Sequence, residues 1–135
     1  LSNRLLSFYQ TLVHDKLIKS NRSLNNMLSS LYGNLSWYYL FVNKPEKAKE
    51  SAEKGLRLNP EKLFIKGNLA HANLFLGNYS DALNGYKFNY KNKQKINGSK
   101  TFLEATLADF KEFKEAGLTH PNLDKMIKEV SSFSK

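Results

Sequence analysis

The sequence contains no cysteine, and this absence excludes several kinds of site. Without cysteine the chain can form no disulfide, no thiolate nucleophile and no cysteine-ligated zinc site. The absence does not identify the redox compartment, so cytoplasmic and extracellular locations both stay open. We take the cytoplasm as the default localisation.

Long apolar runs and a leader segment are also missing. No stretch approaches the ~18 uninterrupted apolar residues that a membrane-spanning helix needs. The chain begins LSNRLL, without an initiator Met and without a basic segment before an apolar run. We therefore expect no membrane span and no signal peptide. Whether this is a complete protein or the C-terminal portion of a larger bacterial protein stays open, as does the oligomeric state.

Acidic residues are scarce relative to basic ones, with 12 Asp and Glu against 21 Lys and Arg and a formal net charge of +9. The basic residues are nearly all Lys, the exceptions being Arg4, Arg22 and Arg57. Arginine supplies bidentate contacts to phosphates and bases, whereas scattered Lys mainly keeps a surface hydrated. Nucleic acid is therefore a disfavoured partner. A Lys-rich module that binds an acidic surface or nucleic acid remains the alternative to the main interpretation below.

Catalytic motifs are absent as well. The three histidines, His14, His71 and His120, are dispersed, and no metalloprotease helix motif, phosphate-binding Gly-rich loop or nucleophile elbow occurs. His14 and Asp15 are sequence neighbours, which point to different parts of a helix surface, so they are not expected to form a catalytic dyad. The sequence predicts no enzyme, no metal site and no cofactor.

Apolar residues recur every three or four positions through most of the chain, which predicts amphipathic helices and an all-α fold. At 135 residues a single domain, 1–135, is the default. The seven predicted helices cover 2–18, 24–42, 45–58, 63–76, 79 to about 90, 102–116, and a last segment opened by 119–121 and running through 130.

The breaks between these segments carry turn and capping residues. Asn43 tolerates a left-handed backbone, Pro45 can begin the next helix, and Thr101 can cap the helix that follows it. Residues 91–100, KNKQKINGSK, contain one apolar side chain and an Asn-Gly pair. We predict that this segment is a mobile surface loop.

One nine-residue pattern, Gly-Asn-Leu-small-x-x-x-Leu-Phe, occurs twice in the sequence, and we call it the repeated frame. Its copies are GNLSWYYLF at 33–41 and GNLAHANLF at 67–75, which are 34 residues apart. Each copy lies in the first helix of a predicted pair, and this period resembles that of the tetratricopeptide repeat (TPR) family. The first copy carries the pattern as Tyr32, Leu35, Ser36, Tyr39, Ala48, Ala52, Gly55 and Asn59-Pro60. The second carries it as Leu69, Ala70, Gly77, Tyr79, Ala82 and Tyr86.

The resemblance implies antiparallel helix pairs stacked as a short right-handed superhelix. Residues 1–28 would hold the N-terminal helix and the start of a long second helix, 29–62 repeat 1, 63–96 repeat 2 with its loop, and 101–133 a capping hairpin. Small residues such as Ser36, Ala48, Ala70 and Ala82 would let helix backbones approach each other.

The resemblance also implies a function, because the first helix of each pair in such a stack lines a concave groove. The residues expected there are Asn34, Trp37, Phe41, Asn68, His71 and Phe75. Asparagine can pair with a peptide backbone, and the aromatic rings can bind apolar side chains. We therefore predict a non-enzymatic scaffold that binds a protein or peptide. The alternative is that the N-terminal helix or the last helices cover these residues.

Overall fold

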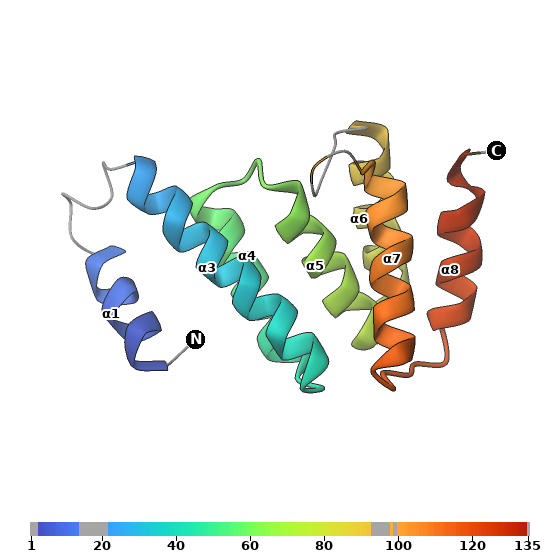
Figure 1. Cartoon of the computed structure of the whole chain (residues 1–135), viewed down its shortest axis with the longest axis horizontal. Coiled ribbons are helices and arrows are strands. Elements are labelled where there is room, and N and C mark those ends of the chain that lie inside the picture. Colours follow the sequence, from blue (N-terminus) through green and yellow to red (C-terminus); the bar gives the residue numbers. More distant parts are fainter. Residues whose placement is uncertain (1–2, 14–21, 93–97, 99, 135) are drawn as a thin grey trace.

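The computed structural model describes residues 3–13, 22–92, 98 and 100–134, which form seven α-helices and a short 3₁₀ helix (Figure 1). No strand occurs among these residues, so the predicted all-α class is confirmed. The helices are α1 (Asn3–Val13), α3 (Arg22–Phe41), α4 (Pro45–Leu58), α5 (Leu63–Phe75), α6 (Tyr79–Asn92), α7 (Phe102–Glu115) and α8 (Leu123–Ser131), followed by η1 (Ser132–Ser134).

The helix ends follow the capping chemistry of the sequence. Asn43, after α3, has a φ of 59°, and Pro45 occupies the first turn of α4, as predicted. Gly77 and Gly117, after α5 and α7, have φ values of 85° and 78°. This backbone conformation favours glycine and tolerates asparagine. At the other end of α7, Thr101 Oγ1 accepts a hydrogen bond from the Glu104 N–H at 3.4 Å.

Some predicted boundaries differ from the structure, and others lie outside the described residues. Helix α3 begins at Arg22, two residues before the predicted start, and residues 91–92, predicted as loop, belong to α6. The last helix begins at Leu123, later than the predicted opening at 119–121. The reason is a local turn, in which His120 Nδ1 accepts a hydrogen bond from the Asn122 N–H at 3.1 Å. The continuation of the first helix over 14–18 and most of the predicted loop, 93–97 and 99, fall outside the described residues.

The helices succeed one another from α1 at one end of the molecule to α8 at the other (Figure 1). Helix α3 packs most extensively on α4, and α5 packs on both α6 and α4. A contact between α3 and α5 joins the two helices that carry the repeated frame. Helix α7 packs on α6 and α8, and α5 lies between α3 and α7 in Figure 1.

Small residues lie where the helices cross. Ser36, Ala48 and Ala82 have no exposed surface, and Ala70 is 2% exposed. A Cβ atom built on Gly85 of α6 would lie only 3.0 Å from the Cβ of Ala70 on α5. Such spacing requires small side chains on both helices, because a larger residue would force the backbones apart.

Across the described part of the chain, no helix combines the length and apolar character needed to cross a membrane.

Candidate functional site

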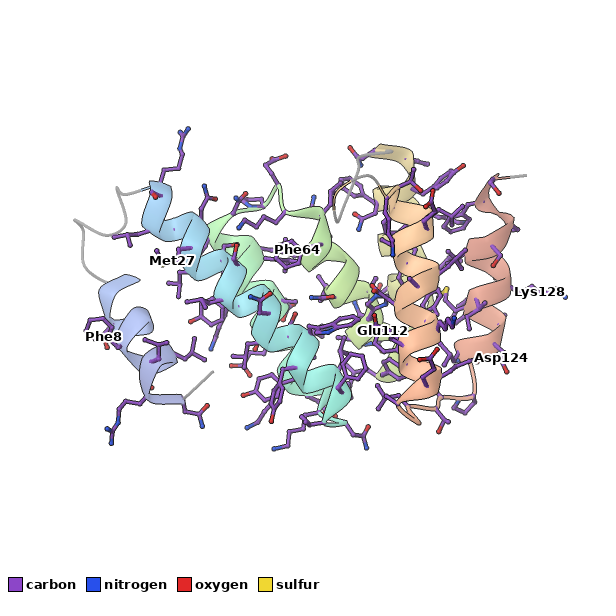
Figure 2. The ribbon with its side chains drawn as sticks, in the orientation of Figure 1. Phe8, Met27, Phe64, Glu112, Asp124 and Lys128 are labelled. Carbon is purple, nitrogen blue, oxygen red and sulfur yellow. The ribbon has the colours of Figure 1, made fainter. Side chains whose placement is uncertain are left out.

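A groove with a volume of about 310 Å³ lies between α3, α5 and α7, and we call it the α5 groove. Figure 2 labels two of its residues, Phe64 on α5 and Glu112 on α7. Its lining consists of Asn34 and Trp37 from α3, Leu63, Phe64, Gly67 and Asn68 from α5, and Phe102, Ala105, Thr106, Asp109 and Glu112 from α7.

The two copies of the repeated frame explain why a groove forms at this place. A Cβ atom on Gly33, in the first copy, would lie 2.6 Å from Phe64 Cε2 and 2.8 Å from Ile65 Cγ1, because α5 packs tightly on α3 there. For a Cβ atom on the matching Gly67, the nearest neighbour among the described residues would be Asn89 Nδ2, at 3.9 Å. Helix α7 therefore does not pack on α5 as α5 packs on α3.

The spacing of the left-handed residues that follow α3, α5 and α7 agrees with this difference. Asn43 and Gly77 are 34 positions apart, whereas Gly117 follows Gly77 by 40. The stretch that holds α6, the connection after it and α7 is thus six residues longer than one period of the repeat. Helix α7 is shifted relative to a regular third copy of the repeat, and the space left beside Gly67 belongs to the groove.

Three of the six predicted site residues line this groove. Asn34 is exposed, and its side chain forms no hydrogen bond with any residue that the structure describes. Trp37 is half-buried, and Asn68 is 6% exposed. These three side chains come from the two copies of the frame and meet at one surface.

The other three predicted residues, Phe41, His71 and Phe75, lie against Phe113 of α7, which has no exposed surface. The ring centroids of Phe41, His71 and Phe75 lie 5.4, 4.9 and 5.2 Å from that of Phe113. Trp37 joins the same cluster, with its centroid 5.5 Å from that of Phe113. Helix α7 thus covers one end of the predicted concave surface and leaves the end at Asn34, Trp37 and Asn68 open.

Asn68 is fixed in orientation by its amide nitrogen. Nδ2 donates to the Gly33 carbonyl and to Ser36 Oγ, both at 3.1 Å, while Ser36 Oγ donates to the same carbonyl at 2.7 Å. Because a backbone carbonyl can only accept, Nδ2 must be the amide atom that faces Gly33. The Oδ1 atom has no hydrogen-bond partner among the described residues.

His71 connects α5 to both α6 and α7 through its two ring nitrogens. Nδ1 lies 2.7 Å from Tyr86 Oη, and Nε2 lies 2.9 Å from Asp109 Oδ2. An imidazole with its hydrogen on Nε2 donates to Asp109 and accepts from the Tyr86 hydroxyl, so each of the two contacts has one donor and one acceptor. Burial, followed by the nearby Asp109 carboxylate, raises the pKa of Tyr86 well above its ordinary value.

Asp109 and Glu112 give the groove an acidic wall, which the sequence did not single out. Asp109 is 29% exposed and Glu112 is exposed. Among the residues that the structure describes, no Lys or Arg lines the groove, although the chain as a whole carries a net charge of +9. Sequence reasoning treated α7 as part of a capping hairpin, and α7 contributes no third copy of the frame that would have marked its groove-facing residues.

Elsewhere in the part of the chain with described coordinates, no group of three or more His, Asp and Glu residues is arranged to hold a metal ion. His14 and Asp15 lie outside the described residues. No protein-family model matches the sequence, and neither the curated proteins nor the solved structures include a match to it.

Proposed function

We propose that this protein is a non-enzymatic interaction scaffold of the tetratricopeptide type, with helix pairs stacked so that α3, α5 and α7 form its inner surface. The α5 groove is the proposed site, and it takes a segment of a partner protein. The supporting observation is that Asn34, Trp37 and Asn68, placed by the two copies of one frame, line a single open groove with α7.

The composition of the groove supports a binding role. Trp37 and Phe64 offer apolar surface, while Asn34 and Asn68 offer polar atoms beside it. Grooves that recognise small ligands combine apolar surface with fixed polar groups and have volumes of roughly 300–1,000 Å³. Polar atoms make up more than half of the surface of this groove, so we expect it to select a polar or charged group. At about 310 Å³ the groove fits one or two side chains of a partner segment.

The Tyr86–His71–Asp109 arrangement supports binding without catalysis. Tyr86 is fully buried and its raised pKa keeps the phenol neutral, so it cannot serve as a nucleophile. His71 is 1% exposed and both of its ring nitrogens are already in contact with protein groups. A general base must reach the proton that it removes, and His71 cannot reach a molecule in the groove.

A selection experiment with a matched variant tests the proposal. Short random peptides displayed on phage are selected on the folded chain, and the affinities of the best peptides are measured for the parent and for Gly67→Leu. The new side chain adds bulk to the groove wall, and its Cβ has ordinary van der Waals clearance, 3.9 Å from Asn89 Nδ2. Asn84→Leu, on the exposed surface of α6, is the control.

We expect Gly67→Leu to weaken binding at least tenfold, which corresponds to about 1.4 kcal/mol, and Asn84→Leu to leave it unchanged. Equal affinity of all three proteins would overturn the proposal. Affinity that falls steeply with salt and ignores Gly67→Leu would support the Lys-rich alternative, because binding by displaced counterions depends strongly on salt.

A further inference from the structure

We propose that the α5 groove recognises an arginine side chain of the partner segment. This inference rests on the proposed function, and it names the chemistry that the groove selects. Three features carry it: the two carboxylates on α7, the fixed carbonyl oxygen of Asn68, and the Trp37 ring.

The carboxylates of Asp109 and Glu112 lie one helical turn apart on α7 and both line the groove. Asp109 uses Oδ2 for His71, and Oδ1 has no hydrogen-bond partner among the described residues. The Glu112 carboxylate has no ion pair with any Lys or Arg in the described segments, although Lys111 and Lys114 on the same helix pair with Glu115 and Asp124. Two negatively charged hydrogen-bond acceptors therefore line a groove to which the described residues contribute no basic side chain.

Asn68 supplies an independent acceptor. The side chain is more than nine-tenths buried and lines the groove, and its nitrogen is committed to Gly33 and Ser36. The remaining Oδ1 is a carbonyl-type oxygen held in place with no partner in the described chain. Oδ1 keeps access to solvent in the groove, so a ligand can donate a hydrogen bond to it in place of water.

The ring of Trp37 favours arginine over lysine as the side chain that the groove binds. Its ring lines the groove, and aromatic faces attract both cations, but only the planar guanidinium can stack on the ring and donate from its edge at the same time. Arginine has five N–H donors in one plane, which suits acceptors from two helices. Lysine carries its three donors on a single atom.

The net charge of the whole protein does not prevent this recognition. At physiological salt, charges separated by more than roughly 8 Å are largely screened, so the groups in the groove decide which ligand binds. The two carboxylates of the α5 groove attract a cationic side chain while the net positive charge of the chain disfavours cations elsewhere, which gives the interaction specificity.

The first test uses free probes that differ in charge but hardly in shape. N-acetyl-arginine methylamide and the corresponding citrulline compound are titrated into the labelled protein, and the Trp37 indole N–H and Asn68 side-chain signals are followed by NMR. Trp37 is the only tryptophan, so its indole signal is unambiguous. We expect saturable shifts with arginine and none with citrulline. Equal shifts with both probes, or none with arginine, would overturn the inference.

The second test uses Glu112→Gln, with Glu115→Gln as its control. Both residues are exposed on α7, both changes remove one negative charge, and only Glu112 lines the groove. We expect Glu112→Gln to weaken binding of the arginine probe about two- to fivefold, the effect of an exposed ion pair, and Glu115→Gln to have no effect.

The peptides selected for the proposed function separate the two ideas. If they are enriched in arginine and lose affinity when it is replaced by citrulline, both ideas hold. Peptides that respond to Gly67→Leu but show no preference for arginine would retain the scaffold and remove this inference. If no peptide responds to Gly67→Leu, the proposed site itself is wrong.

Discussion

The Nδ1 atom of His71 lies 2.7 Å from the hydroxyl oxygen of Tyr86, and both side chains are buried. This contact ties α5 to α6, while Asp109 on the other ring nitrogen ties α5 to α7. The hydrogen-bond network of Tyr86, His71 and Asp109 thus helps to hold α7, which forms one wall of the groove, in position. Buried polar groups of this kind stabilise one arrangement only when every member has its partner.

The substitution Tyr86→Phe tests how much this hydrogen-bond network contributes to stability. The phenylalanine keeps the ring packing against His71 and Phe110 but leaves His71 Nδ1 without its partner. We expect a loss of about 1–3 kcal/mol in the free energy of unfolding, because a buried acceptor loses its hydrogen bond. Chemical denaturation measures it, and Tyr38→Phe, at a 59% exposed position, is the control with no expected change. A parent-like unfolding curve for Tyr86→Phe would contradict the role assigned to the hydroxyl.

Stability should fall in alkaline solution because two tyrosines have raised pKa values in the folded state. Burial and Asp109 raise the pKa of Tyr86, while partial burial and the Glu129 carboxylate raise that of Tyr79 to about 12. A tyrosine in the unfolded chain ionises near pH ~10. The two protonated tyrosines therefore contribute fully to the free energy of unfolding below about pH 10. This contribution is lost as the pH rises toward the tyrosine pKa values of the folded state, since the unfolded state releases its protons first.

Tyrosinate absorbance of the folded protein measures this directly. Of the seven tyrosines, those at 79 and 86 should ionise well above the pH of about 10 at which an unfolded tyrosine does. The fall in unfolding free energy above about pH 10 should be shallower in Tyr86→Phe than in the parent, which also separates the tyrosine effect from the titration of lysines. A single tyrosine transition near pH ~10 in the folded protein would contradict the prediction.

The two glycines at matching positions of the repeated frame should respond oppositely to alanine. Gly67→Ala should raise the unfolding free energy by roughly 0.5–1 kcal/mol, because alanine favours a helix and its Cβ has room. Gly33→Ala should lower it, because the new methyl would lie 2.6 Å from the Phe64 ring and 2.8 Å from the buried Ile65. Thermal unfolding of both variants measures the difference, and effects of the same sign and size would mean that α7 packs on α5 as α5 packs on α3.

Phe113 should contribute strongly to the position of α7. Its ring contacts Trp37, Phe41, His71 and Phe75 and has no exposed surface. Phe113→Ala should cost about 3–5 kcal/mol and should shift the fluorescence of Trp37, whose ring loses that neighbour. Phe88→Ala, at a 48% exposed position, is the control and should cost far less. Similar losses for both variants would show that the aromatic cluster does not hold α7.

Much of the fold could be predicted because it is specified by nearby residues. The apolar period fixes where helices lie, and Asn43, Pro45, Gly77 and Thr101 act within one turn of their own position. His120 shows the limit, since its hydrogen bond to the Asn122 N–H delays the start of α8 in a way that composition does not indicate.

The groove could be predicted only in part, because half of it depends on α7. Asn34, Trp37 and Asn68 were found through the repeated frame, but Asp109 and Glu112 belong to a helix without that frame. The sequence separation of 38 residues between His71 and Asp109 is not a multiple of the repeat period. Nothing local therefore indicates that these two side chains meet or that α7 covers Phe41 and Phe75.

The most direct test of the account is an NMR map of the amide signals that move when a selected peptide binds. We predict that the largest shifts fall on residues of the α5 groove, Asn34, Trp37, Gly67, Asn68 and Thr106, and that they disappear in Gly67→Leu. Shifts centred instead on the outer surface between α4, α5 and α6, around Leu56, Lys66 and Phe88, would contradict the claim that this protein binds its partner through the groove between α3, α5 and α7.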